Sequence, residues 1–214
     1  MVNISIRATN KRISDEQLLE ALTKAIEGQN LKRVLLLPPD MTRLHSYAGK
    51  ITALYYQMLK DTCQVDIMPA LGTHDPMSEA ECLEFFGADV PFSVILPHRW
   101  KEDVVKIGTV PAEYVSEVSE GLIDFPIDVE VNQRLLDPSY DLIISIGQVV
   151  PHEVVGMANY SKNIFVGCGG KMIINRSHFL GAVYGMERVM GKDFSPVRKV
   201  FDYAEAHFIP KMPL

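Results

Sequence analysis

Two histidines and a lysine lie close together in the stretch 151–178, and side chains of these kinds can move protons, bind anions or hold metals. His152 directly follows an apolar run over 141–150 that is typical of a buried strand. Lys162 lies in mostly apolar surroundings, where an amine loses its proton more easily and can become a nucleophile or a covalent anchor. His178 could be a metal ligand, although a capping or core position is the commoner fate of a lone histidine.

Other reactive side chains follow two earlier apolar runs. Asp40 and Arg43 come after the run over 34–37, and His74 comes after the run over 65–71. The guanidinium fork of Arg43 suits a carboxylate or a phosphate, and histidine suits general acid or base work because it titrates near neutrality. The carboxyl ends of parallel strands share one edge of a sheet, so these side chains are expected to converge with those of the later stretch.

Each of these residues also has an ordinary structural interpretation. Asp40 and Thr42 could satisfy backbone donors in a turn, and Arg43 could form a surface ion pair. The stem of Lys162 could cover apolar surface while its amine reaches water. Taken singly, each residue fits the ordinary interpretation more often; taken together, their expected convergence on one sheet edge favours a site.

The composition limits the kinds of partner and the cellular compartment that are expected for this protein. The chain has 214 residues, enough for one large domain or two small ones, with 21 basic and 27 acidic residues and a net charge of -6. This balance argues against nucleic acid as the main partner. The 3 cysteines form no Cys-x-x-Cys pair, which indicates a reduced, cytoplasmic protein. No apolar run is long enough to cross a bilayer, so no membrane is expected.

The elements that must position the reactive residues alternate between strands and helices. Strands followed by polar loops and helices are typical of Rossmann-like βαβ units, so the sequence predicts an α/β fold with a mostly parallel sheet flanked by helices. Strands are predicted over 34–37, 65–71, 92–96, 104–110 and 141–150, and helices over 15–27, 48–59, 79–86, 178–190 and 196–207. We also expect a short strand over 2–6 and a short helix around 131–135.

Three short motifs and two fixed spacings between reactive residues lie within residues 33–178, which make up most of the chain. Lys162 follows His152 by ten positions, and His178 follows Lys162 by sixteen. In this combination the sequence resembles the N-terminal part of the lactate racemase family, the nickel-pincer-nucleotide racemases and epimerases of 2-hydroxy acids. The matching motif residues are Asp40, Thr42 and Arg43 of an Asp-x-Thr-Arg loop, Gly72, Thr73 and His74 of a Gly-Thr-His loop, and Pro151, His152, Glu153 and Gly156 of a Pro-His-Glu-x-x-Gly segment.

The resemblance implies a bound nickel-pincer nucleotide. Lys162 resembles the lysine that holds this cofactor covalently, and His178 resembles the protein ligand that completes the square-planar site of the nickel. Asp40 and Thr42 match loop residues beside the cofactor. The proteins that make the cofactor would then be partners of this chain.

The resemblance also implies how a substrate is handled. His74 and His152 resemble the two acid/base histidines on opposite faces of the substrate, and Arg43 resembles an anion-binding residue that contacts the substrate. One histidine takes the hydroxyl proton while hydride moves from the substrate to the cofactor, and the planar keto acid receives hydride on its other face. The cofactor supplies the hydride chemistry, and the protein supplies orientation and proton transfer.

Two departures and one absence qualify this resemblance. Leu44 stands where lactate racemase has proline, and Asn159, Tyr160 and Ser161 stand where it is glycine-rich. A hydroxy acid or sugar acid larger than lactate is therefore as good a candidate substrate. The family also has a C-terminal domain that closes the cleft, and residues 1–214 correspond to the N-terminal cofactor-binding domain alone, so this fragment is expected to be weakly active or inactive by itself.

Two other functions use the same residues. A zinc-type hydrolase or lyase would need three ligands on one metal, for which His74, His152 and His178 are the candidates. A non-catalytic module that binds anions would need only the sheet edge and its basic side chains. It predicts that His74→Ala leaves ligand binding intact.

Overall fold

A three-stranded parallel sheet forms the centre of the computed structural model, which describes residues 3–9, 12–209 and 212–214. The strand order is β2-β1-β5, with β1 (Arg33–Leu37) between β2 (Gln64–Ile67) and β5 (Leu142–Ser145). Both pairings are parallel, which confirms the predicted α/β fold with a parallel sheet flanked by helices.

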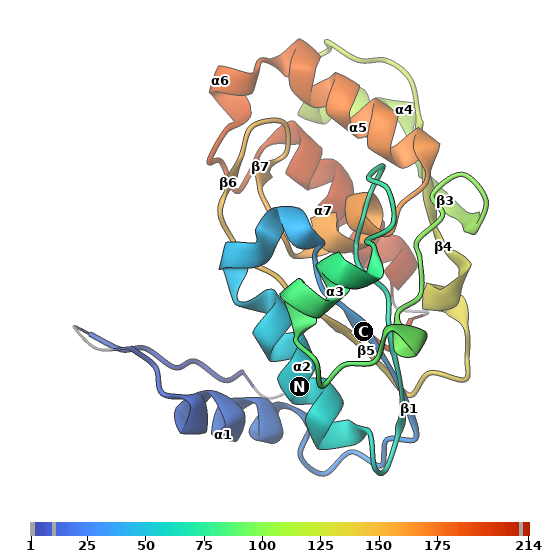
Figure 1. The fold of residues 1–214 in the computed structure, drawn as a ribbon. Helices are drawn as coiled ribbons and strands as arrows, with labels where there is room; N and C mark the ends of the chain where they lie inside the picture. Colours follow the sequence, from blue (N-terminus) through green and yellow to red (C-terminus); the bar gives the residue numbers. More distant parts are fainter. Residues whose placement is uncertain (1–2, 10–11, 210–211) are drawn as a thin grey trace.

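Seven α-helices and four short 3-10 or π-helical segments surround the strands in the described part of the chain (Figure 1). Ser14 and Ser78 cap α1 and α3 through complete capping boxes, and Ser195 with Pro196 begins α7, as their sequences predict. The helices are α1 (Asp15–Ile26), α2 (Ala48–Leu59), α3 (Glu79–Phe86), α4 (Ala112–Val118), α5 (Lys171–Tyr184), α6 (Met186–Val189) and α7 (Pro196–Phe208). The short segments are η1 (Met41–Ser46), η2 (Phe92–Val94), η3 (Gln133–Leu136) and η4 (Asn163–Gly167).

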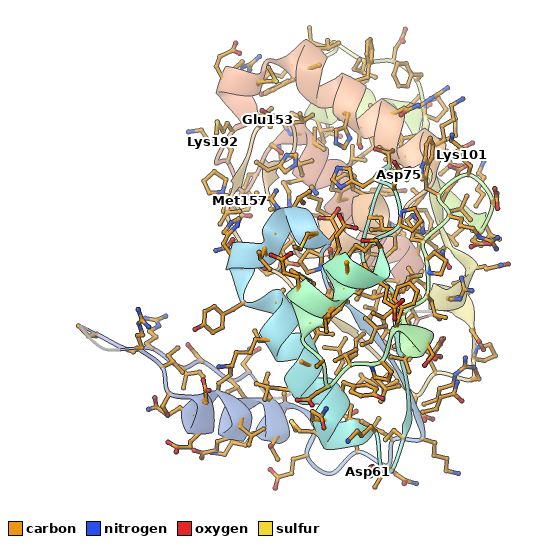
Figure 2. All side chains as sticks on the ribbon, in the orientation of Figure 1. Asp61, Asp75, Lys101, Glu153, Met157 and Lys192 are labelled. Carbon is orange, nitrogen blue, oxygen red and sulfur yellow. The ribbon has the colours of Figure 1, made fainter. Side chains whose placement is uncertain are left out.

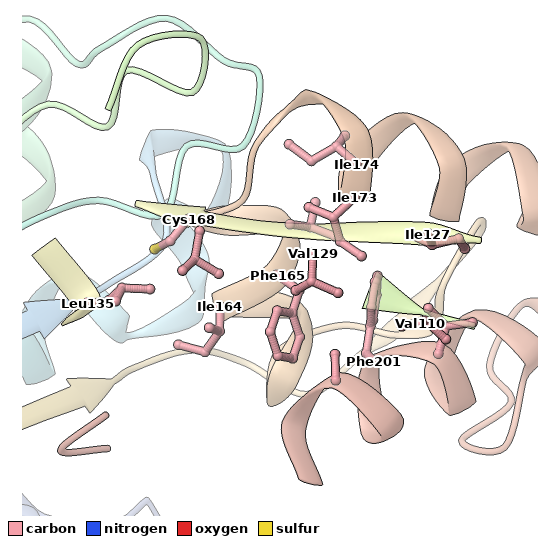
Figure 3. Packing of buried hydrophobic residues seen from close by; sticks show 14 of the residues in the cluster. Val110, Ile127, Val129, Leu135, Ile164, Phe165, Cys168, Ile173, Ile174 and Phe201 are labelled. Carbon is pink, nitrogen blue, oxygen red and sulfur yellow. The ribbon is translucent and has the colours of Figure 1, made fainter. Parts of the chain in front are cut away.

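Two hydrophobic cores lie on the two faces of β1. Successive side chains of a strand point to opposite faces, so Leu35 and Leu37 enter one core while Val34 and Leu36 enter the other. The larger core contains parts of α5, α7 and the antiparallel pair β3 (Val104–Val110) and β4 (Ile127–Asn132). Figure 3 shows this core, where Phe165 of η4 packs beside Val129 and Phe201.

Several predicted elements differ from the structure. The strand expected over 92–96 is the 3-10 helix η2, and only an isolated bridge joins Ile95 to Ile67 of β2. Strand β4 was missed, and the helix expected around 131–135 is the 3-10 helix η3 after it. Residues 3–6 form no regular structure, and Val2 lies outside the described residues.

Other boundaries shift without changing the fold. The strand predicted over 141–150 ends at Ser145, and the helix predicted from 178 begins earlier, at Lys171. A separate two-stranded ribbon, β6 (Pro151–His152) and β7 (Gly156–Met157), follows β5. Within the residues described, no helix combines the length and the apolarity needed to cross a bilayer.

Candidate active site

One cavity of about 280 Å³ lies at the carboxyl edge of the parallel sheet. It is lined by side chains from η1, from the loop after β2, from the β6 region, from the segment that begins η4, and from α5. All seven side chains singled out in the sequence line this cavity, namely Asp40, Thr42, Arg43, His74, His152, Lys162 and His178. Figure 2 labels Asp75 and Glu153, the sequence neighbours of two of the histidines, in the upper half of the same view.

A buried carboxylate holds His74 at the cavity wall. The side chain of Asp40 is 9% exposed and caps η1, where it accepts hydrogen bonds from the backbone N–H of Thr42 (3.1 Å) and from the Thr42 hydroxyl. Its second oxygen pairs with Nδ1 of His74, whose side chain is 59% exposed. A carboxylate can only accept, so the neutral His74 carries its proton on Nδ1 and leaves Nε2 free as a base.

His152 has the opposite arrangement. Its Nδ1 accepts hydrogen bonds from the backbone N–H groups of Val154 and Val155, both at 3.2 Å. The neutral ring therefore carries its proton on Nε2. Burial lowers the pKa of His152 to about 4, and the positive charges of Lys162, His178 and Arg43 add to this effect.

Lys162 directly precedes the π-helical segment η4, whose apolar side chains Ile164, Phe165 and Val166 are buried in the larger core. Burial, with smaller contributions from the charges of Arg43 and Arg198, lowers the pKa of the Lys162 amine to about 8, and Asp40 opposes the shift. The next residue, Asn163, donates from Nδ2 to the carbonyl oxygen of Leu37 (3.0 Å) and to the hydroxyl of Ser145 (2.9 Å). This side chain ties the lysine segment to the ends of β1 and β5.

His178 presents one free nitrogen to the cavity. It lies on α5, where its Nδ1–H donates to the carbonyl oxygen of Ile174 at 2.8 Å, and burial lowers its pKa. The rings of His152 and His178 are 6.4 Å apart between centroids and nearly perpendicular, at 86°. A histidine whose Nδ1–H is fixed by a carbonyl has its Nε2 lone pair oriented for a metal.

A glycine completes the cavity wall beside the lysine, and a buried cysteine lies behind it in the core. The carbonyl oxygen of Gly167 accepts from the backbone N–H of Gly72 at 2.8 Å, and a Cβ at Gly167 would lie 2.6 Å from Cβ of Ala70. The loop that carries His74 therefore packs directly on η4. Cys168 follows in the core, fully buried, and burial raises the pKa of its thiol to about 12.

The lactate racemase N-terminal domain family matches residues 5–191, which is most of the chain. The chain belongs to this family. No curated protein gives a significant match to the sequence.

Two solved structures share the fold of this family member. A crystal structure of a protein from Thermotoga maritima has 26% identity and a TM-score of 0.81, and the match covers 90% of this chain and 47% of that one. The lactate racemase apoprotein from Thermoanaerobacterium thermosaccharolyticum has 20% identity and a TM-score of 0.66, with 95% and 48% covered. The second likeness shows the fold alone. The chain spans about half the length of both proteins.

Three amide side chains in the cavity of this lactate racemase-family domain were not predicted from sequence. Gln148, Asn159 and Asn163 all line it. Asparagine and glutamine occur throughout loops, so only the position of Asn163 directly after Lys162 could have indicated its role. Among the described residues, no three His, Cys, Asp or Glu side chains are grouped so that they could hold a metal ion.

Proposed function

We propose that this chain is the cofactor-binding domain of a racemase or epimerase that acts on 2-hydroxy acids and uses a nickel-pincer nucleotide. Family membership supports the reaction class. The observation that carries the proposal is the cavity in which Lys162, His74, His152 and Arg43 meet, although they come from distant parts of the chain. A domain of this kind would interact with the proteins that make the cofactor, and it would bind the hydroxy acid.

The residues present fit this cofactor. Lys162 has a pKa of about 8, so about a tenth of its amine is unprotonated at pH 7, far more than for an ordinary lysine, and can form a covalent bond. His178 has its Nδ1–H engaged by Ile174, which leaves Nε2 to coordinate the metal. A single protein ligand is enough where the cofactor supplies the remaining donors, so a grouping of three protein ligands is not required.

The bound cofactor would accept and return the hydride at the substrate's Cα. The chain's own residues would handle the charge and the hydroxyl proton. Arg43 would bind the carboxylate through two parallel hydrogen bonds. His74 would take the hydroxyl proton on Nε2, and the carboxylate of Asp40 would stabilise the imidazolium that forms.

His152 would act first as a hydrogen-bond donor. Its neutral ring presents Nε2–H, because Nδ1 already accepts from two backbone groups. A neutral imidazole of this kind can polarise a keto oxygen, as happens in triosephosphate isomerase. The low pKa of His152 supports this role, since an imidazolium would be costly beside Lys162 and Arg43.

The zinc-type hydrolase has less support, because the described residues offer no grouping of three metal-binding side chains. A module that only binds anions would not need the pairing of Asp40 with His74 or a lysine with a lowered pKa. The paired and buried state of these groups favours chemistry over simple binding.

Intact mass spectrometry of the chain, produced together with the cofactor-making enzymes, tests the proposal. We expect an added mass equal to that of the nucleotide on the wild-type chain and its loss in Lys162→Met. Lys171→Met is the matched control, because Lys171 is exposed and does not line the cavity. An unmodified wild-type chain, or an adduct that persists in Lys162→Met, would contradict the proposal.

A further inference from the structure

Two consecutive residues before Lys162 adopt the left-handed backbone conformation. Asn159 has φ 65° and Tyr160 has φ 52°. This region is unfavourable for residues that carry a Cβ, least so for asparagine, and a pair in succession needs support from its surroundings. These residues belong to the segment that departs from the glycine-rich pattern of the family.

The support comes from a buried arginine on α7. Arg198 is 4% exposed, and its guanidinium donates to the backbone carbonyl of Asn159 at 3.2 Å. The same guanidinium lies 5.8 Å from the ring centroid of Tyr160. Its acidic neighbour, Asp202, is 3.7 Å away and half exposed. A buried cation requires partners, and the turn at Asn159 and Tyr160 provides two of them.

The first turn of α7 is itself fixed to the same loop. The hydroxyl of Ser195 donates to the carbonyl oxygen of Val155 at 2.5 Å and accepts from the backbone N–H of Arg198 at 3.1 Å. A Cβ at Gly156 would lie 2.1 Å from the carbonyl oxygen of Lys192, so the loop and the α7 entry are in close backbone contact. The loop that leads from His152 to Lys162 is therefore held at both ends.

We propose that Arg198 is a positioning residue that holds the turn at Asn159 and Tyr160 in its left-handed form and so directs Lys162 into the cavity. It acts through the backbone and does not line the cavity. It also lies beyond the residues 5–191 that match the family. This role of Arg198 rests on the proposed function, in which Lys162 forms the covalent bond with the cofactor.

The hydrogen bonds of the turn report its conformation. The carbonyl oxygen of Asn159 accepts from the backbone N–H of Lys162 at 3.2 Å as well as from Arg198. The carbonyl oxygen of Tyr160 accepts from the N–H of Asn163 at 2.9 Å. When the turn relaxes, both N–H groups lose their acceptors and exchange with solvent faster.

Amide hydrogen exchange, measured residue by residue by NMR, tests the proposal on the chain without cofactor. In Arg198→Met we expect the amides of Lys162 and Asn163 to exchange at least tenfold faster, while those of Leu35 and Leu36 in β1 keep their rates. Adding Tyr160→Gly to Arg198→Met should restore the slow exchange to within about threefold, because glycine accepts a positive φ without strain.

Lys199→Met is the matched control, since Lys199 is the exposed neighbour on α7, and it should leave both amides unchanged. If Arg198→Met does not fold, Arg198→Lys replaces it, with an expected acceleration of three- to tenfold. Unchanged exchange in a folded Arg198 variant, equal acceleration throughout β1, or no rescue by Tyr160→Gly would overturn the proposal. Loss of the mass adduct on the wild-type chain would contradict the proposed function and leave this exchange result intact.

Discussion

His74 and His152 differ in which ring nitrogen carries the proton. Asp40 holds the proton of His74 on Nδ1, whereas two backbone N–H groups occupy Nδ1 of His152. In the free site, one ring thus offers a lone pair and the other offers an N–H. This asymmetry supplies one proton acceptor and one hydrogen-bond donor before any substrate binds, without requiring a charged imidazolium.

The carboxylate of Asp40 should determine the tautomer of His74. In Asp40→Asn the amide can donate to Nδ1, so we expect the ring proton to move substantially from Nδ1 to Nε2. Long-range 15N NMR of the ring measures the two populations. The ring of His152 serves as an internal control, because its backbone donors are unchanged. An Nδ1–H tautomer that persists at His74 would show that Asp40 does not control it.

The buried amine of Lys162 should lower the free energy of unfolding, because the burial that lowers its pKa also penalises its charged form. Its pKa is lowered from 10.5 to about 8 on folding, so the folded state binds fewer protons between these values and stability rises as pH rises through them. At pH 7 the buried charge costs about 3 kcal/mol. We expect Lys162→Met to increase the free energy of unfolding by about 2 kcal/mol at pH 7 and by little above pH 10.5.

Urea denaturation at the two pH values measures this difference. The control Lys171→Met removes an exposed lysine and should change stability by less than about 0.5 kcal/mol. A Lys162→Met protein that is less stable than wild type at pH 7 would mean that the stem of the lysine contributes more by packing than its charge costs.

At the scale of secondary-structure elements, the sequence correctly predicted a strand that is buried along its length and helices that begin at capping residues. The apolar run of β1 and the capping boxes of α1 and α3 are local features, and the structure agrees with them. The segment 92–96 is also mostly apolar, but it meets the sheet through only one bridge, between Ile95 and Ile67. Such pairing depends on distant residues and cannot be read from the segment itself.

Strand β4 was missed for a related reason. Its sequence alternates acidic and apolar residues, and its burial follows that alternation, because one face packs on the core. The alternation covers only the short stretch Ile127–Asn132, so it is a weak local signal. The irregularity in this pairing, between Lys106 and Gly108, lies in the partner strand β3 and cannot be foreseen from the sequence of β4.

The packing between the His74 loop and η4 should be sensitive to a single methyl group. In Gly167→Ala the new Cβ would lie 2.6 Å from Cβ of Ala70 and 3.2 Å from the amide oxygen of Asn163. We expect a loss of about 1–3 kcal/mol in stability and loss of the slow amide exchange of Gly72, whose N–H donates to Gly167. Denaturation and NMR exchange measure the two effects.

Gly49→Ala provides the matched control for this substitution. Its Cβ would lie 2.0 Å from the carbonyl oxygen of Phe85, in the contact between α2 and α3 and away from the cavity. It should destabilise the protein as a whole. The amide of Gly72 should then exchange no faster, relative to the other amides of the chain, than it does in the wild type. Equal effects of both substitutions on Gly72 would show that this hydrogen bond reports only global stability.

At the scale of the whole molecule, the arrangement of two cores around one sheet explains why residues far apart in sequence meet. β1 lies in the middle, and the loops after β1 and β2 and the segment after β5 leave the same edge. The sequence predicted this convergence from strand order and polarity. It could not predict hydrogen-bond partners such as Asp40 with His74, or the support of Lys162 by α7, because these depend on tertiary packing.

The buried histidines should make the protein less stable in mild acid. The pKa of His152 is lowered from 6.5 to about 4 on folding, so this group contributes stability that is present above pH 6.5 and lost as pH falls toward 4. Burial lowers the pKa of His98 and His178 in the same direction. Between pH 7 and pH 5, His152 alone should account for a decrease of about 2 kcal/mol in the free energy of unfolding.

Denaturation of the wild-type chain and of His152→Gln at the two pH values checks this expectation. The variant should lose about 2 kcal/mol less than the wild type between pH 7 and pH 5. His45→Gln is the control, because His45 is exposed and its replacement should leave the pH dependence unchanged. Identical pH dependence in His152→Gln and wild type would mean that the ring titrates normally in the folded state.

The burial of Cys168 has a chemical consequence for the neighbouring cavity and for the nickel cofactor proposed to bind there. A thiol with a pKa of about 12 stays protonated at physiological pH, and a protonated, enclosed sulfur neither captures stray nickel or copper nor oxidises readily. The chain can thus keep a sulfur atom six residues after Lys162 without placing a second nucleophile beside that amine.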